Sequence, residues 1–265
     1  MVIKQENLSK KLEGINKDNV FVVADFDKTI TTKNSNTTFS LFSKSGFYPE
    51  EYAYDREKLY QYYRPIELDP KISDEEKYKF MKEWQEKAYR LLLKYQVRES
   101  DIAKIIEFPA LIELRDYAVD FMKYLKMQGI PLIINSAGIG NFIIALLERY
   151  ECMGDNVFIY SNMLEFVNDE IVDSIDDIIH SMNKYNIQVP NYFKKVLSSR
   201  KKAILIGDQL SDLKMMGNLD ADDVISFGFL ESKVEENEEE FLKRFDVVLK
   251  GDETFDSINK ILSLR

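Results

Sequence analysis

Six short apolar runs along the chain have the composition of buried β-strands. Each run is rich in Val, Ile, Leu or Phe and is separated from the next by a loop or a helical segment. The runs are residues 20–24, 130–135, 156–162, 203–207, 224–228 and 246–249. Short buried strands that alternate with helices are typical of a doubly wound parallel sheet. The pattern therefore predicts an α/β fold.

Helical periodicity dominates the long stretch between the first two runs. The clearest helix begins with a capping box at Ser73–Glu76, and its apolar residues keep helical spacing to about Gln96. Similar patterns at 52–63 and 101–107 predict two more helices, and a fourth at 111–127 should return the chain to the sheet.

This helical stretch is too long for a simple crossover between neighbouring parallel strands. An inserted module explains it best. We therefore predict a helical cap domain at residues 35–110, placed within an α/β core that is formed by residues 1–34 and 111–265.

Composition excludes several classes of function. The chain has 46 acidic and 36 basic residues and a net charge of −10, whereas binding of polymeric nucleic acid depends on concentrated Lys and Arg. With His180 and Cys152 as the single residues of their types, a zinc site of the usual kind and an intramolecular disulfide are excluded. We expect His180 to be structural, and any catalysis to depend on carboxylates.

The sequence shows neither the pattern of a secretory signal nor that of a membrane span. The amino terminus is polar, without the apolar run of a secretory signal, and no apolar stretch approaches the length that spans a bilayer. We therefore expect a soluble, cytoplasmic protein with no membrane partner.

Candidate chemistry follows the ends of the predicted strands, where ligands of parallel sheets bind. Asp25 and Asp27 come directly after the first run, and the period of two in extended chain directs both to the same side. Ser136, Ala137 and Gly138 follow the second run as a turn of small residues that opens a helix. A hydroxyl and free backbone N–H groups in such a turn form a cradle for an anion.

Two further acids, Asp208 and Asp212, follow the run 203–207. Together with Asp25 and Asp27 they predict an oxygen-rich site that suits Mg²⁺. A site for phosphoryl transfer also needs a fixed positive side chain to bind the charged phosphoryl oxygens.

The order of these motifs resembles the haloacid dehalogenase (HAD) superfamily of phosphohydrolases that use an aspartate nucleophile. The matching residues are DFDKT at 25–29, Ser136, Lys184 and GDQLSD at 207–212. The resemblance implies a Rossmann-like doubly wound parallel sheet, the HAD core, and the long insertion is similar to the helical cap of that superfamily.

A narrower resemblance is to the cytosolic pyrimidine 5′-nucleotidases, the 5′-nucleotidase III family. Segments 65–70, 81–84 and 179–184 are similar to family segments in the family order. The chain departs from the family pattern at Gln85, at Tyr89 and at Arg64, which interrupts a Tyr-Tyr-Pro string. These departures lie in the predicted cap, so they affect the expected substrate more than the expected chemistry.

The resemblance implies a role for each acid. Asp25 attacks phosphorus and becomes an aspartyl phosphate, and Asp27 protonates the leaving oxygen and later activates water. The backbone carbonyl of Asp27 and the side chains of Asp25 and Asp208 hold Mg²⁺, and Asp212 is a further metal ligand or orients the other ligands.

The same resemblance implies how the substrate is bound. Ser136, the N–H of Ala137 and Lys184 bind the remaining phosphoryl oxygens, and Gly138 belongs to the same cradle. In the cap, our hypothesis is that Glu83 accepts a hydrogen bond from the amino group of a base and that Trp84 forms an aromatic wall.

These inferences predict a Mg²⁺-dependent 5′-nucleotidase that hydrolyses pyrimidine nucleoside monophosphates such as CMP and UMP, and the resemblance suggests a monomer. One alternative keeps the chemistry and changes the substrate to another small phosphate ester, such as a phospho-amino acid or an intermediate of methionine salvage. A second is a catalytically silent HAD scaffold, although silent relatives tend to lose an acid that this chain retains.

Overall fold

The computed structural model describes residues 2–4, 7–231, 234–251 and 253–262. Residues 1 and 263–265, at the ends of the predicted core, lie outside these ranges. In the described part, one sheet has the strand order β1-β9-β8-β7-β2-β3-β4. The edge strand β1 is antiparallel to β9, and every other neighbouring pair is parallel. The predicted α/β fold is therefore confirmed.

The parallel strands correspond to the six predicted apolar runs. They are β2 (Val20–Ala24), β3 (Leu132–Ile139), β4 (Val157–Asn162), β7 (Lys202–Gly207), β8 (Asp223–Leu230) and β9 (Val247–Lys250). The strands outside those runs are β1 (Val2–Lys4) and a separate hairpin of β5 (Glu165–Val167) and β6 (Glu170–Val172). All three are only three residues long, which gives too little sequence for a period to be recognised.

Helices cover both faces of the sheet. The core helices are α1 (Leu8–Leu12), α6 (Ala118–Gln128), α7 (Gly140–Arg149), α8 (Asn191–Leu197), α9 (Val234–Arg244) and α10 (Phe255–Leu262). Val20 and Val22 of β2 belong to the hydrophobic cluster that includes residues of α6, α7 and α10. Phe21 and Val23 belong to a second cluster with residues of α8 and α9. This alternation along β2 buries both faces, as a doubly wound sheet requires.

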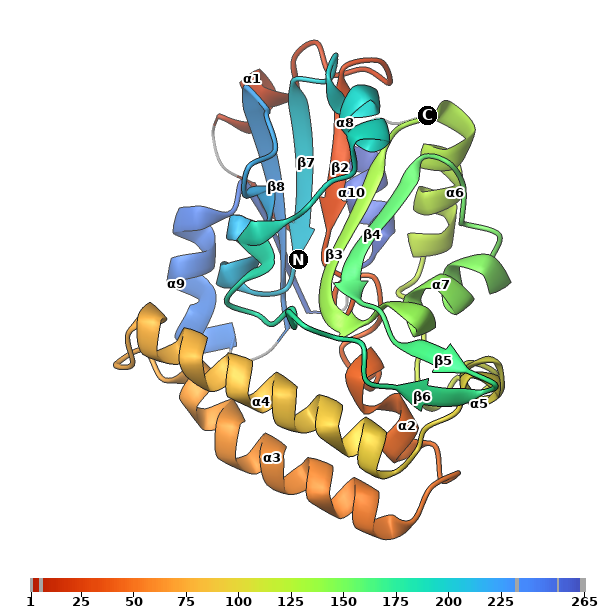
Figure 1. Cartoon of the computed structure of the whole chain (residues 1–265). Coiled ribbons are helices and arrows are strands. Elements are labelled where there is room, and N and C mark those ends of the chain that lie inside the picture. Colours follow the sequence, from red (N-terminus) through yellow and green to blue (C-terminus); the bar gives the residue numbers. More distant parts are fainter. Residues whose placement is uncertain (1, 5–6, 232–233, 252, 263–265) are drawn as a thin grey trace.

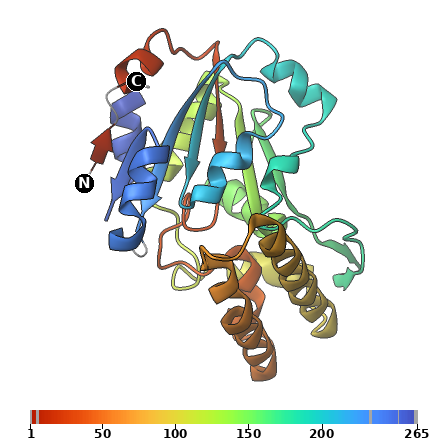
Figure 2. The same ribbon diagram turned by 90° about the vertical axis from the view of Figure 1, so that its left-hand side faces the viewer.

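The inserted helices lie beyond the carboxyl ends of the parallel strands (Figures 1 and 2). They are α2 (Leu41–Lys44), α3 (Glu50–Leu68), α4 (Asp74–Lys94) and α5 (Glu99–Ile105), preceded by the 3₁₀ turn η1 (Thr38–Ser40). The predicted capping box at the start of α4 is present, with the Glu76 N–H donating to Ser73 Oγ at 3.3 Å. None of these helices, nor any other in the described ranges, is long and apolar enough to cross a membrane.

The chain enters and leaves this helical insertion along two adjacent segments. The Thr32 N–H donates to the Glu113 carbonyl at 2.9 Å, and the Asn36 N–H donates to the Leu111 carbonyl at 2.9 Å. The cap boundaries at 35 and 110 stay a prediction.

Two local predictions were wrong. Helix α6 begins at Ala118 and not at residue 111, because residues 111–115 are not helical and are bonded to the segment that enters the insertion. Strand β3 continues through Ser136 to Ile139, where a turn was expected. Its pairing with β4 is shifted after Asn135 and resumes between Ile139 and Asn162, so an irregular strand replaces the turn.

The sheet order places a crevice at the central strands. β2 lies between β3 and β7, so the chain winds to opposite sides from this point. Asp25 and Asp208 directly follow β2 and β7, and Ser136 lies in the second half of β3. Ligands of doubly wound sheets bind outside such a switch point.

A buried arginine fixes the loop that follows Asp27. Arg115 Nε donates to the Thr29 carbonyl at 3.0 Å, and Nη2 donates to the Lys28 carbonyl at 2.6 Å. Its two Nη atoms also contact the Glu231 carboxylate, at 2.6 and 3.1 Å. Lys28 has a φ of +70°, which is uncommon for a residue with a side chain. Arg115 therefore holds a turn that the local sequence alone does not favour.

We expect Arg115→Ala to lower the free energy of unfolding by about 3–5 kcal/mol, because Glu231 is left buried without its partner. Urea unfolding followed by circular dichroism measures the change. The matched control is Lys123→Ala, which breaks an exposed ion pair with Glu151 and should cost less than about 1 kcal/mol. Equal losses in the two variants would contradict the structural role of Arg115.

His180 is buried where the cap helix α4 meets the core. Its ring contacts Tyr78 edge-on with centroids 4.7 Å apart, and Nδ1 accepts a hydrogen bond from the Met182 N–H at 3.2 Å. Burial, with a smaller effect from Lys82, lowers the pKa of His180 from 6.5 to about 4. The neutral imidazole is therefore the form that the fold favours.

This depressed pKa predicts a loss of stability in acid. The contribution is complete above pH 6.5, the unfolded pKa, and declines as the pH falls toward the folded value of about 4. From pH 7.5 to pH 5, the wild type should lose about 2 kcal/mol more than His180→Asn, whose amide oxygen can replace Nδ1 as acceptor. Urea unfolding at both pH values tests this, and parallel losses in the two proteins would refute it.

Candidate active site

Asp25 lies at the carboxyl end of β2 in a buried position. Its backbone N–H donates to the Ile206 carbonyl at 3.0 Å, which continues the ladder with β7, and its Oδ2 accepts from Thr29 Oγ1 at 3.1 Å. Burial, together with nearby Asp212 and Asp27, raises the pKa of Asp25 to about 7, against the opposing effect of Lys184. A carboxylate with this surrounding needs a positive neighbour to stay ionised near neutral pH.

Lys184 provides that positive charge. Its Nζ lies 2.5 Å from Asp25 Oδ1 and 2.9 Å from Asp212 Oδ1, with all three side chains buried. Burial opposes the charge, but the carboxylates of Asp212 and Asp25 outweigh it and raise the pKa of Lys184. Asn135 Nδ2 donates to the Lys184 carbonyl at 2.8 Å, which ties the 3₁₀ turn η2 (Lys184–Asn186) to β3.

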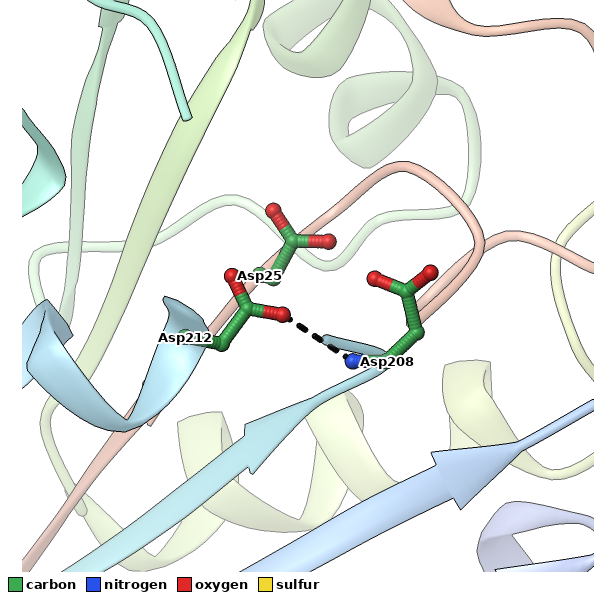
Figure 3. A group of neighbouring side chains, drawn as sticks. All are labelled: Asp25, Asp208 and Asp212. Carbon is green, nitrogen blue, oxygen red and sulfur yellow. Dashed lines mark hydrogen bonds between the residues drawn. The ribbon is translucent and has the colours of Figure 1, made fainter. Parts of the chain in front are cut away.

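Three carboxylates surround a common space in Figure 3. One oxygen from each of Asp25, Asp208 and Asp212 lies within 4.8 Å of the others. Asp212 Oδ2 accepts from the backbone N–H groups of Asp208, at 3.1 Å, and Gln209, at 2.9 Å. Burial, followed by Asp212 and Asp25, raises the pKa of Asp208 well above its ordinary value. Clustered hard oxygens that repel one another fit a divalent cation such as Mg²⁺.

Gly207 makes this cluster possible at the end of β7. A Cβ atom there would lie 2.5 Å from Asp212 Cβ, so any larger residue would displace the acid. The four acids of the sequence prediction thus meet at one edge of the sheet, although the carboxylate of Asp27 is not part of the three-acid group.

Asp27 is instead held by the segment that enters the cap. Its Oδ1 accepts from the Thr38 N–H and its Oδ2 from Thr38 Oγ1, both at 2.9 Å. Burial raises the pKa of Asp27, and the Thr38 hydrogen bonds oppose this effect. A fixed carboxyl group with a raised pKa suits proton transfer. Thr38 was missed at the sequence level because only the tertiary structure brings it to Asp27.

The predicted anion cradle has a fixed backbone. Ser136 is buried, and its Oγ accepts from the Gly138 N–H at 3.0 Å. The Ala137 carbonyl accepts from Asn162 Nδ2 at 3.0 Å and from Gln85 Nε2 of α4 at 3.3 Å. Gln85, which departs from the family pattern, therefore contacts the cradle directly.

A cavity of about 460 Å³ joins these groups to the cap helices. Its inner end is lined by Asp25, Asp27, Lys184 and Asp208, and its walls include residues of α3 and α4. Trp84 lines one wall and stacks on Tyr63, with centroids 5.9 Å apart and planes 12° apart. The role of Trp84 as an aromatic wall for a base stays a prediction.

Glu83 does not line this cavity, so the structure corrects our hypothesis for that residue. It is half exposed, and its carboxylate lies 2.6 Å from Lys87 Nζ, which also donates to Tyr63 Oη of α3 at 2.9 Å. Met81 and Gln85 line the cavity, and the helical period directs a residue midway between them to the opposite face.

Two acids of α3, Glu57 and Glu67, line the cavity, and Glu67 is the one that also contacts the core. Its carboxylate is paired with Arg64 and accepts from Ser181 Oγ at 2.6 Å. Glu67 lies within the family segment 65–70 that was recognised in the sequence. That resemblance was the available signal, but it did not direct the prediction to Glu67 in place of Glu83.

Comparison with known proteins places this site in a family. The family model described as "Pyrimidine 5′-nucleotidase (UMPH-1)" matches residues 24–264. The 7-methylguanosine phosphate-specific 5′-nucleotidase B of Xenopus laevis is 33% identical over 269 aligned positions, which cover 97% of this chain and 92% of that protein. The human 7-methylguanosine phosphate-specific 5′-nucleotidase is 31% identical and covers 92% and 84% of the two chains.

Solved structures agree. The crystal structure of cytosolic 5′-nucleotidase IIIB bound to cytidine superposes with a TM-score of 0.87, at 28% identity over 99% of this chain and 93% of that one. A phosphoserine phosphatase complex, at 16% identity and a TM-score of 0.58 over 93% and 99% of the two chains, shares the fold. The chain belongs to the pyrimidine 5′-nucleotidase (UMPH-1) family and is a 5′-nucleotidase of the HAD type.

Proposed function

We propose that the chain is a Mg²⁺-dependent 5′-nucleotidase that hydrolyses pyrimidine nucleoside 5′-monophosphates such as CMP and UMP. The observation that carries this proposal is the cavity that joins the buried acids and Lys184 to the aromatic and polar walls of α3 and α4. A phosphate at its inner end leaves room for a nucleoside along the cap helices. We keep the monomeric state and a cytoplasmic location as predictions.

In the first step, an oxygen of Asp25 attacks phosphorus while the bond from phosphorus to the 5′-oxygen breaks. Asp27 transfers its proton to that oxygen, and the nucleoside leaves as an alcohol. The raised pKa of Asp27 and its two hydrogen bonds from Thr38 support this role. Lys184 and Ser136 bind the phosphoryl oxygens that do not react.

In the second step, the ionised Asp27 takes a proton from water, and the water oxygen attacks phosphorus of the aspartyl phosphate. The bond from phosphorus to Asp25 breaks, which restores the Asp25 carboxylate and releases inorganic phosphate. Asp27 ends in its protonated state, so the residues return to their starting forms.

Asp25, Asp208 and Asp212, with the backbone carbonyl of Asp27, would hold Mg²⁺. When bound, the ion supplies positive charge that allows an anionic nucleophile to approach an anionic phosphate. The close approach of three acid oxygens supports this assignment.

For recognition of the base, we propose Glu67 in place of Glu83, with Trp84 as the aromatic wall. The Glu67 carboxylate lines the cavity and can accept a hydrogen bond from the amino group of cytosine. The similar 5′-nucleotidase IIIB was crystallised with cytidine bound, which supports a base of this kind. A second candidate substrate is 7-methylguanosine 5′-monophosphate, which the names of the Xenopus and human relatives favour.

Phosphate release from CMP in the presence of Mg²⁺ tests the chemistry. Asp25→Asn should lower kcat/KM by at least about 1,000-fold, because the nucleophile is lost. Asp27→Asn should lower it by about 100- to 10,000-fold on CMP, and by less on p-nitrophenyl phosphate, whose leaving group needs no proton.

The same assay with EDTA tests the metal: release should stop and should return when excess Mg²⁺ is added. Hydrolysis of no nucleotide by the wild type would refute the proposal, and full activity in EDTA would refute the metal requirement.

Glu67→Gln tests the base contact. The variant should lower kcat/KM for CMP by about 10- to 100-fold, because a charge-assisted hydrogen bond is lost. The matched control is Glu83→Gln, which changes an exposed acid on α4 and should leave kcat/KM unchanged. If the loss appeared in Glu83→Gln and not in Glu67→Gln, the correction made from the structure would be wrong.

A further inference from the structure

Helix α3 presents a row of polar and aromatic side chains to the cavity. Arg56, Tyr60, Arg64 and Glu67 line it at spacings of four, four and three residues, which place them on one face of a helix. Arg64 and Glu67 lie at the end near the catalytic acids, where Ser181 contacts Glu67. Arg56 precedes Arg64 by two turns, about 12 Å along the helix axis. It lies at the part of the cavity that Phe39 also lines.

Arg56 lacks partners for its buried donors. Its Nε and Nη1 atoms are both inaccessible and make no hydrogen bond. The guanidinium carbon lies 5.1 Å from the centroid of the Phe39 ring, so an apolar side chain supports one face of the group. Burial lowers the pKa of Arg56, against a small opposing effect of Tyr52. A guanidinium stays protonated despite such a shift, so an unpaired positive charge lines the cavity.

The neighbouring cations, in contrast, have carboxylate partners. Arg64 is paired with Glu67, and Lys44 lies 3.9 Å from Glu57. In the part of the chain that the structure describes, no carboxylate lies within ion-pair distance of Arg56. Because Nε and Nη1 are inaccessible, the donor that a ligand in the cavity can reach is Nη2, and an acceptor oxygen there gains a charge-assisted hydrogen bond.

Aromatic side chains also line the cavity. The rings of Tyr60 and Trp84 contact each other, with centroids 6.1 Å apart and planes 59° apart, so a base can pack against them but not between them. When the phosphate of a nucleoside monophosphate occupies the inner end, its base is the part that reaches these rings and Arg56. The oxygen acceptors on a base are its carbonyl groups.

We propose that Arg56 is a specificity-determining residue that donates to a carbonyl oxygen of a neutral pyrimidine base and disfavours a positively charged base. This inference rests on the proposed function and deepens it. Uracil and cytosine both carry a carbonyl group and no net charge. 7-Methylguanine carries a delocalised positive charge, which an unpaired guanidinium in a partly desolvated cavity repels. The chain therefore prefers UMP and CMP to 7-methylguanosine 5′-monophosphate.

The test compares kcat/KM for UMP, 7-methylguanosine 5′-monophosphate and base-free ribose 5-phosphate, with an inhibition constant where a compound is not hydrolysed. Arg56→Gln should lower the value for UMP by about 10- to 100-fold and raise the preference for the methylated nucleotide, while ribose 5-phosphate stays within about twofold. Arg56→Lys should keep the discrimination against the charged base, because it keeps the charge.

The matched control is Lys58→Gln. Lys58 is an exposed cation of the same helix, with Nζ 4.2 Å from the Tyr54 ring centroid, and it does not line the cavity. Lys58→Gln should leave kcat/KM and the inhibition constants for all these compounds unchanged. An unchanged ratio of UMP to the methylated nucleotide in Arg56→Gln, or an equal loss for ribose 5-phosphate, would overturn the proposal. So would a larger loss for uridine 3′,5′-bisphosphate than for UMP, which would identify a site for a second anion.

Binding distinguishes this proposal from the proposed function. Trp84 is the single tryptophan of the chain and lines the cavity, so its fluorescence reports occupancy. In an Asp25→Asn background, UMP should bind about 10- to 100-fold more weakly when Arg56 is also Gln. Absence of nucleotide hydrolysis by the wild type would refute the nucleotidase. Equal UMP affinity with Arg and with Gln at position 56 would refute the role of Arg56 whatever the activity.

Discussion

Four carboxyl groups at one edge of the sheet surround a single buried ammonium group, and this imbalance of charge governs the whole site. If Asp25, Asp27, Asp208 and Asp212 were all ionised, the buried charge of Lys184 would not balance them, and Lys28 and Arg64 would offset the excess only in part. Burial and the neighbouring acids raise the pKa values of Asp25 and Asp208, and burial raises the pKa of Asp27, so these groups tend to hold a proton. Asp212 instead accepts hydrogen bonds from two backbone N–H groups. A fold that maintains such a cluster without a further cation loses stability to it, so the arrangement is best explained by a ligand that supplies positive charge.

Much of this fold could be predicted from the sequence, because its main elements have strong local signals. The buried strand β2 is an apolar run with acids directly after it, and the capping box at Ser73 marks the start of α4. The rule that ligands bind at the carboxyl ends of parallel strands then indicated which polar residues would meet. That rule uses chain order alone, which explains why Asp25, Ser136 and Asp208 were found although they lie far apart in the sequence.

The errors arose where a local signal is ambiguous or where the tertiary structure decides. Glu83 and Glu67 are both acids on cap helices, and only the packing of α3 against α4 shows that Glu67 lines the cavity. Nothing in the sequence distinguishes Arg56 from an exposed cation, because only the tertiary structure places its guanidinium over the Phe39 ring. Strand β3 passes through Ser136 to Ile139 because its pairing with β4 resumes after an irregularity. A run of small residues is equally typical of a turn, so the sequence did not show that the strand continues.

The contact between Thr38 and Asp27 links recognition to reactivity. Thr38 stands on the segment that enters the cap, and its hydroxyl also accepts from the Ile139 N–H at 3.1 Å, at the end of β3. Thr38 therefore holds the start of the helical insertion against the ends of both β2 and β3. Under the proposed function, the segment that leads into the enclosure of the nucleoside is thus the same segment that orients the carboxyl group of the proton donor.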